Sequence, residues 1–162
     1  MIPIIYIYRK LPRLIPEPIK DKKTLINYSF YVIAIIVFAI LMNVAITQLG
    51  LMKESTGFTE ASETLLDGTI WVQVLCNAIV IPILEETLFR GIIAGQLYMW
   101  HGIYVATIFS AICFGISHFN IVQFLYAFIV GLGLGFLYCK TKRLSLCIIA
   151  HSLVNLIVII FT

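Results

Sequence analysis

The chain has 162 residues, of which 61% are hydrophobic and 12% are charged, and its mean hydropathy is +1.04. These values exclude a soluble globular domain and predict a single all-α domain, a polytopic bundle of transmembrane helices. The net charge of +3 does not indicate nucleic-acid binding, because six of the eleven basic residues precede the first long apolar stretch, where the positive-inside rule places a cytoplasmic flank: Arg9, Lys10, Arg13, Lys20, Lys22 and Lys23.

The first predicted element is an N-terminal arm, residues 1–26, that does not cross the membrane. Residues 1–8 are apolar but too few to span a bilayer. Pro12, Pro16 and Pro18 interrupt any helix that follows them. Because the arm is basic, we expect it to lie on the cytoplasmic side, along the membrane interface.

Residues 27–162 are predicted to form the membrane domain, with five spans at 27–49, 69–100, 103–118, 121–138 and 145–161. The acidic stretch 50–68 is expected on the outer side. A second basic loop, at Lys140, Lys142 and Arg143, then falls on the same side as the arm. The two basic clusters therefore predict a multi-pass protein of the cell membrane, with its N-terminus cytoplasmic and its C-terminus outside.

Two adjacent carboxylates and an arginine lie within the second span, at Glu85, Glu86 and Arg90. An ionised carboxylate at membrane depth costs several kcal/mol, so such residues are usually paired and functional. Glu86 and Arg90 are four residues apart, so they can form a pair on one helix face. Glu85 points about 100° away and stays available for chemistry. Pro82 lies three residues before Glu85 and is expected to kink the helix there.

Later spans carry three more strongly polar side chains. His118 ends the third predicted helix, and His151 and Asn155 are four residues apart on one face of the fifth. In the fourth helix, Gly131 and Gly135 form a small-residue face that favours close packing against a neighbouring helix.

One carboxylate and two histidines on three helices, Glu85, His118 and His151, form the ligand set of a catalytic zinc site that leaves one position for water. The same residues also suit metal-free chemistry, in which a carboxylate and a histidine polarise a water molecule. Asn155 is better suited to donate its amide to a developing oxyanion. A transporter that uses the polar cluster for ion passage, and simple interhelical packing, remain alternatives.

Three motifs in this order resemble the CPBP family of intramembrane proteases: Glu85–Gly91 matches EExxFRG, Phe114–His118 matches FxxxH, and His151–Asn155 matches HxxxN. This family includes CAAX prenyl endopeptidases of the Rce type, the bacterial abortive-infection (Abi) group and bacteriocin self-immunity proteins. The similarity covers about residues 72–159, the expected catalytic core. It implies an intramembrane endopeptidase, a metalloprotease or a metal-free glutamate enzyme, that cleaves a peptide or a membrane-protein segment within or at the bilayer.

The resemblance also implies roles for the site residues. Glu85 would be the catalytic carboxylate, and His118 would help it to activate water or to bind a metal. His151 and Asn155 would complete the site, and Glu86 and Arg90 would be an orienting pair. The alternative is a non-catalytic bacteriocin-immunity or transport protein. We expect the site to be reached from the cytoplasmic half, although counting spans places His118 near the outer face.

Overall fold

The computed structural model describes residues 2–49 and 69–161, and every regular element in these two ranges is a helix. Four helices are long and apolar enough to cross a membrane: Lys22–Gln48, Ile70–Ile116, Ile121–Thr141 and Leu144–Phe161. The prediction of an all-α polytopic helix bundle is confirmed. The acidic stretch 50–68 lies outside the described residues.

The N-terminal arm contains a short helix, α1 (Ile2–Lys10), followed by an extended segment. Helix α2 (Lys22–Gln48) then begins earlier than the predicted Asn27. The reason is a helix cap: the carboxylate of Asp21 accepts a 2.7 Å hydrogen bond from the backbone N–H of Thr24. Such a cap satisfies one of the free N–H groups of the first helical turn.

The stretch Ile70–Ile116 is a composite helix, kinked at Gly102, whose first part alternates between α and π hydrogen bonding. Its segments are α4 (Ile70–Gln73), the π-helix η1 (Val74–Val80), α5 (Ile81–Glu86), the π-helix η2 (Thr87–Ala94) and α6 (Gly95–Ile116). Pro82 lies in the first turn of α5, directly after η1. Where the sequence predicted a kink, the chain therefore changes from π to α geometry. π-Helical turns are rare and occur frequently at functional sites.

The predicted turn at His101-Gly102 is present as a kink inside Ile70–Ile116, which is one of the four candidate spans and contains two of the five predicted helices. Gly102 has φ 78° and ψ −174°, which is not helical, so two helices meet at this residue. A positive φ of this kind is one that glycine adopts at little cost. The chain folds back at this kink, because Phe114 lies against Phe89, with ring centroids 5.3 Å apart, and under the guanidinium of Arg90. The predicted turn between two helices is therefore confirmed.

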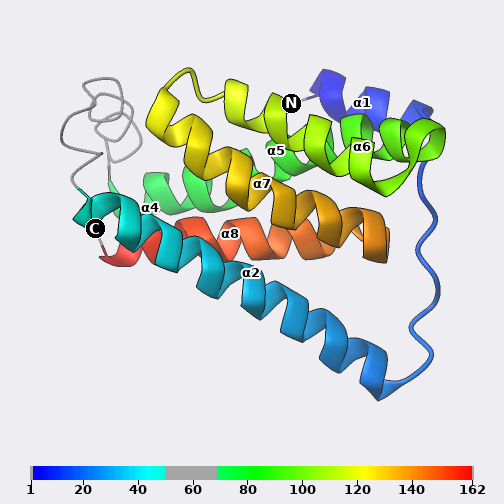
Figure 1. The fold of residues 1–162 in the computed structure, drawn as a ribbon, viewed down its shortest axis with the longest axis horizontal. Coiled ribbons are helices and arrows are strands. Elements are labelled where there is room, and N and C mark those ends of the chain that lie inside the picture. The colour runs from blue at the N-terminus through cyan, green and yellow to red at the C-terminus, as the bar shows by residue number, and fades with distance from the viewer. Residues whose placement is uncertain (1, 50–68, 162) are drawn as a thin grey trace.

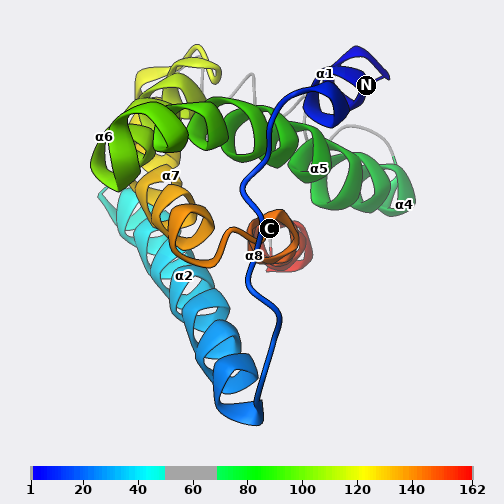
Figure 2. The same ribbon diagram turned by 90° about the vertical axis from the view of Figure 1, so that its right-hand side faces the viewer.

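Helix α8 (Leu144–Phe161) lies at the centre of the bundle, because it contacts α2, α7 (Ile121–Thr141) and the segments η1, α5 and η2. Helices α6 and α7 form the most extensive helix pair. Figure 1 shows α2, α7 and α8 running beside one another. Figure 2 shows the stretch from α4 through α5 to α6 above α7 and α8.

Glycines allow α6 and α7 to approach closely, as predicted for the small-residue face of α7. A Cβ atom at Gly135 would lie 3.3 Å from the Ser110 hydroxyl and from the Thr107 backbone. A Cβ atom at Gly131 would lie 3.1 Å from the Phe114 ring. The close packing of these helices positions Phe114, and with it the turn that follows α6.

The arm is fastened to the end of the bundle that carries the basic loop. Tyr8 packs directly on Gly91 of η2, where a Cβ atom would lie 2.7 Å from its ring. The side chain of Gln96 donates a 2.8 Å hydrogen bond to the carbonyl of Pro12. Arg143 donates to the carbonyl of Glu17 in the same way. These contacts hold the arm against the helix that contains the EExxFRG motif.

Candidate active site

One large cavity, of about 1070 Å³, lies between α2, α7, α8 and the composite helix. Its wall is mainly apolar, with isolated polar side chains, as in many ligand sites. Four of the predicted site residues line it: Glu85, His118, His151 and Asn155. The fold therefore brings together side chains that come from three separate parts of the chain.

The two remaining predicted residues, Glu86 and Arg90, form a buried ion pair behind this cavity. Both side chains are fully buried, and Arg90 Nη1 lies 3.2 Å from Glu86 Oε1. Arg90 also donates a 3.2 Å hydrogen bond to the carbonyl of Gly131, and its guanidinium lies 4.4 Å above the centre of the Phe114 ring. The pair predicted from the four-residue spacing is present in the structure.

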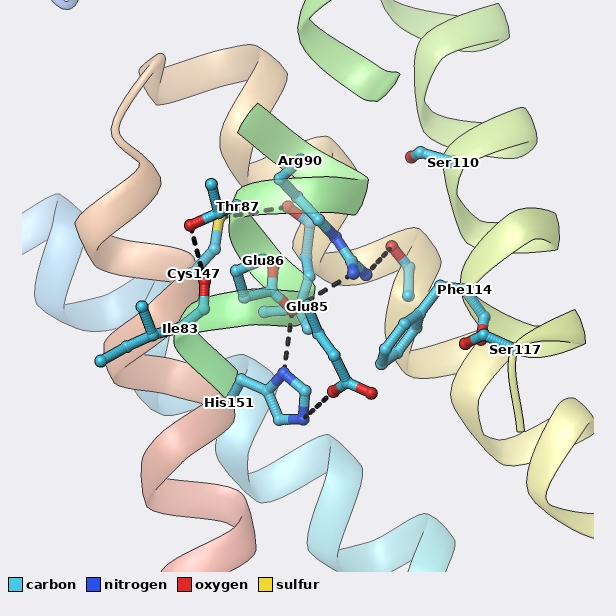
Figure 3. A network of polar contacts seen from close by, with 12 residues as sticks. Ile83, Glu85, Glu86, Thr87, Arg90, Ser110, Phe114, Ser117, Cys147 and His151 are labelled. Carbon is cyan, nitrogen blue, oxygen red and sulfur yellow. Dashed lines mark hydrogen bonds and ion pairs between the residues drawn. The ribbon is translucent and has the colours of Figure 1, made fainter. Parts of the chain in front are cut away.

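His151 lies between the two carboxylates, as Figure 3 shows. Its Nδ1 is 2.9 Å from Glu86 Oε1, and its Nε2 is 3.7 Å from Glu85 Oε2. Since an ionised carboxylate only accepts hydrogen bonds, Nδ1–H donates to Glu86, and this contact fixes the orientation of the ring. The 3.7 Å separation is too long for a hydrogen bond, so Glu85 keeps its capacity to bind water or substrate.

His118 is outside helix α6, which ends at Ile116. It lies in the turn before α7, at a place where Asn120 caps the next helix by accepting from the N–H groups of Val122 and Gln123. His118 Nδ1 is 2.9 Å from the carbonyl of Phe114, so Nδ1–H donates to that carbonyl. The other ring nitrogen, Nε2, is thereby left as an acceptor.

Asn155 is held by a backbone carbonyl of the first π-helix. Its Nδ2 donates a 2.8 Å hydrogen bond to the carbonyl of Asn77 in η1. An amide nitrogen has two hydrogens, so one stays available to another acceptor. The contact fixes the Asn155 side chain at the wall of the cavity, one helical turn after His151.

The cavity occupies the half of the bundle opposite to the one we expected. Its wall uses residues 35–48 of α2, residues 122–134 of α7 and residues 151–161 of α8. These segments begin about two helical turns from the basic loop at 140–143, at Leu134 and His151, and extend to the far ends of α2 and α8, whereas the sequence analysis expected the site to be reached from the loop side. The reason is the turn at 117–120: it brings His118 to Glu85 from the opposite end of the bundle.

The residues of the predicted zinc site face one cavity but do not form a metal-binding arrangement. In the ranges that the structure describes, no group of three or more His, Cys, Asp or Glu side chains is placed to hold a metal ion. The second carboxylate nearby, Glu86, is already paired with Arg90 and His151. Among the described residues, Glu85, His118 and His151 line one cavity without forming such a group, and a zinc site at these residues stays a prediction.

Phe114 is a central site residue whose role the sequence reasoning missed. Its ring contacts the rings of His118 and His151 edge-on, with centroids 5.0 Å and 5.7 Å away, and it also lies under Arg90. The FxxxH spacing indicated that Phe114 shares a helix face with His118. The two backbone carbonyls that hold Arg90 and Asn155, those of Gly131 and Asn77, leave no signal in the sequence.

Comparison with known proteins gives consistent matches. Residues 67–157 match the family described as "Type II CAAX prenyl endopeptidase Rce1-like". The "Putative membrane peptidase YdiL" of Bacillus subtilis (strain 168) is 35% identical over 113 residues, which cover 68% of this chain and 45% of that protein. The "Membrane-embedded CAAX protease MroQ" of Staphylococcus aureus (strain USA300) is 27% identical over 159 residues, which cover 94% of this chain and 63% of that protein.

The chain thus spans about half to two thirds of the length of these two relatives. No solved structure matches it significantly.

Proposed function

Because the chain belongs to the Rce1-like family of type II CAAX prenyl endopeptidases, we propose that it hydrolyses a peptide bond of a membrane-associated substrate in the cavity described above. The proposal rests on one observation: the adjacent carboxylates Glu85 and Glu86 lie in different environments. Glu86 is fully buried and paired, whereas the side chain of Glu85 is 25% exposed and lines the cavity. A carboxylate that lies beside two histidines in an apolar cavity, 3.7 Å from His151 Nε2 and without a lysine or arginine partner, is suited to act as a general base.

In the proposed reaction, Glu85 and His118 Nε2 position a water molecule, and Glu85 takes its proton. The water oxygen attacks the carbonyl carbon of the scissile bond. The resulting oxyanion accepts a hydrogen bond from the free N–H of Asn155, which is the kind of contact that stabilises tetrahedral intermediates. The proton on Glu85 then passes to the leaving amine, and the peptide bond breaks. Glu86 and Arg90 act by positioning His151.

This mechanism uses only side chains of the protein. Zinc stays a prediction from the sequence, and no step of the reaction is assigned to it, because the described residues do not gather into a metal-binding group. We also propose that the protein lies in the cell membrane with its arm and the basic loop at 140–143 on the cytoplasmic side, following the positive-inside rule.

The test is cleavage of internally quenched apolar peptides by the purified protein in lipid nanodiscs, with the products identified by mass spectrometry. The Glu85→Gln variant keeps the shape of the side chain but cannot accept the proton. We expect its rate to fall by about 10²–10⁴-fold at an unchanged thermal stability. The same assay in the presence of a chelator is expected to retain activity.

Two results would contradict the proposal. If the wild-type protein produced no cleavage of any peptide, the non-catalytic transport or immunity alternative would be favoured. If Glu85→Gln lost folded protein together with activity, Glu85 would be structural and not catalytic.

A further inference from the structure

The charge distribution of the cavity has a consequence for the choice of substrate. Among the described residues of its wall, Glu85 is the only carboxylate, and none is a lysine or an arginine. The nearest arginine of the motif, Arg90, is fully buried and engaged by Glu86 and the Gly131 carbonyl. Apart from the two histidines, His118 and His151, the described wall therefore offers an anion no side chain that can carry a positive charge, and its single acidic side chain repels one.

A free C-terminal carboxylate would be poorly accommodated in this cavity. Moving an ionised carboxylate out of water costs several kcal/mol unless an opposite charge pairs with it. Close to Glu85, it would also meet a like charge in a medium that screens less than water does. An amide at the same position carries no charge and avoids both penalties.

The remaining polar side chains of the wall suit a neutral peptide backbone. Asn43 of α2 and Gln123 of α7 carry amides that both donate and accept hydrogen bonds. The hydroxyl of Tyr126, also in α7, is buried and has no hydrogen-bond partner among the described residues. An extended peptide inside a membrane protein needs such partners, because no bulk water is present to satisfy its N–H and C=O groups.

We propose that the cavity takes an uncharged, apolar segment that is cut at an internal peptide bond, and that it discriminates against peptides with a free carboxylate close to that bond. This inference rests on the proposed function, since it assigns the substrate class of the same site. It differs from what the family name implies, because a CAAX motif lies at the extreme C-terminus of a protein, where any cleavage is near a free carboxylate.

The test uses one apolar peptide in two forms, ending three residues after the cleaved bond in either an amide or a free carboxylate. Binding of the fluorescently labelled peptides is measured by anisotropy with the His118→Ala protein in nanodiscs, which retains Glu85. We expect the amide to bind at least about tenfold more tightly than the carboxylate. The same ratio is expected in the kcat/KM values of the wild-type protein.

Two variants identify the source of the preference. Glu85→Gln removes the like charge, so the difference in affinity should shrink. Gln123→Lys places a cation in the cavity wall, so the preference should move towards the carboxylate. Gln96→Lys adds the same charge outside the cavity, where Gln96 contacts Pro12, and should leave the preference unchanged.

The outcomes separate this inference from the proposed function. A preference for the amide in binding, without hydrolysis by the wild-type protein, would support the inference and contradict the proposed reaction. Hydrolysis of both forms at equal rates would overturn the inference and leave the reaction standing. Binding of neither form, or tighter binding of the carboxylate, would also overturn the inference.

Discussion

Glu85 and Glu86 are identical side chains on two faces of one helix, and they differ in burial and in their contacts. On the packed face, Glu86 is fully buried and contacts Arg90 and His151. On the cavity face, the side chain of Glu85 is 25% exposed and has no contact shorter than 3.7 Å to a basic group in the described structure. Adjacent residues in a helix point about 100° apart, so a single helix can provide both environments.

The comparison shows how a membrane domain can maintain a reactive carboxylate. The packed face neutralises one charge and uses it to orient His151, which in turn faces the other carboxylate. The cavity face leaves that second carboxylate to water and substrate. Glu86 therefore contributes to stability, and Glu85 provides the reactive group. Substitutions on the packed face should lower stability, and substitutions on the cavity face should lower activity.

The largest effect is expected from breaking the packed face at Arg90. Arg90→Met leaves Glu86 as a buried carboxylate without its cation, and removing one partner of a buried pair costs about 3–5 kcal/mol. We expect a loss of this size in the free energy of unfolding, measured by reversible denaturation in mixed micelles. The double variant Glu86→Gln/Arg90→Met removes both charges and should be more stable than Arg90→Met alone. Equal stability of the single variant and the wild type would show that the pair is not structural.

On the cavity face, Asn155→Ala should affect catalysis more than stability. Loss of one oxyanion donor typically lowers kcat by about 10²–10³-fold. We expect a decrease of that size with little change in KM, measured with a quenched peptide in nanodiscs. Gln96→Ala is a matched control, because Gln96 also donates its amide to a backbone carbonyl but lies outside the cavity. Similar rates for the two variants would exclude a special role for Asn155.

A smaller effect is expected where α7 approaches the packed face. In Gly131→Ala, the new methyl group would lie 3.3 Å from Arg90 Nη2 and 3.1 Å from the Phe114 ring. Overpacking of this kind costs about 1–3 kcal/mol. Gly133→Ala on the same helix would meet only Ile35, at 3.7 Å, which is an ordinary contact. We expect only the first variant to lower the unfolding temperature; equal melting curves would contradict the packing argument.

The smallest effect concerns a third carboxylate, Asp21, which is exposed to solvent at the start of α2. Its pKa is lowered below 3.8, mainly because the backbone N–H of Thr24 donates to it, with a contribution from the Thr24 side chain. A lowered pKa in the folded state means that the cap stabilises the helix above about pH 4 and that this support is lost as the pH falls through the folded-state pKa.

Hydrogen exchange of the first-turn amides, corrected for the intrinsic rate, should therefore show protection at neutral pH that decreases at acidic pH. Asp21→Asn keeps a capping oxygen but does not titrate, so its protection should be independent of pH. The same acid-induced loss in this variant would show that Asp21 is not the titrating group.

The sequence predicted much of the fold because the signals are local. Long apolar stretches identified the helices, Gly131 and Gly135 identified a close packing face, and the four-residue spacing identified the pair of Glu86 and Arg90. The helix ends were less accurate. Asp21 extended α2 at its start, and the third predicted helix, 103–118, ends at Ile116. The predicted turn at Gly102 was correct.

The arrangement around the cavity was harder to predict because it depends on contacts between distant segments. Phe114 joins His118, His151 and Arg90 through ring contacts that no spacing rule describes. A span count placed His118 far from the other site residues, since such a count assumes straight helices that cross fully. The structure ends α6 before His118 and turns this residue back towards Glu85.

The number of residues in each π-helical segment matters for the site as much as the identity of those residues, because it sets which side chains face the cavity. Residues 74–80 and 87–94 flank the two carboxylates, and each residue in a helix rotates the chain by about 100°. Deleting a single residue from either segment would rotate the helix on one side of the deletion by about 100°, so side chains that face the cavity would turn away from it. Insertions and deletions are usually harmless in surface loops. In this helix, one residue more or less would abolish the site without changing any of its side chains.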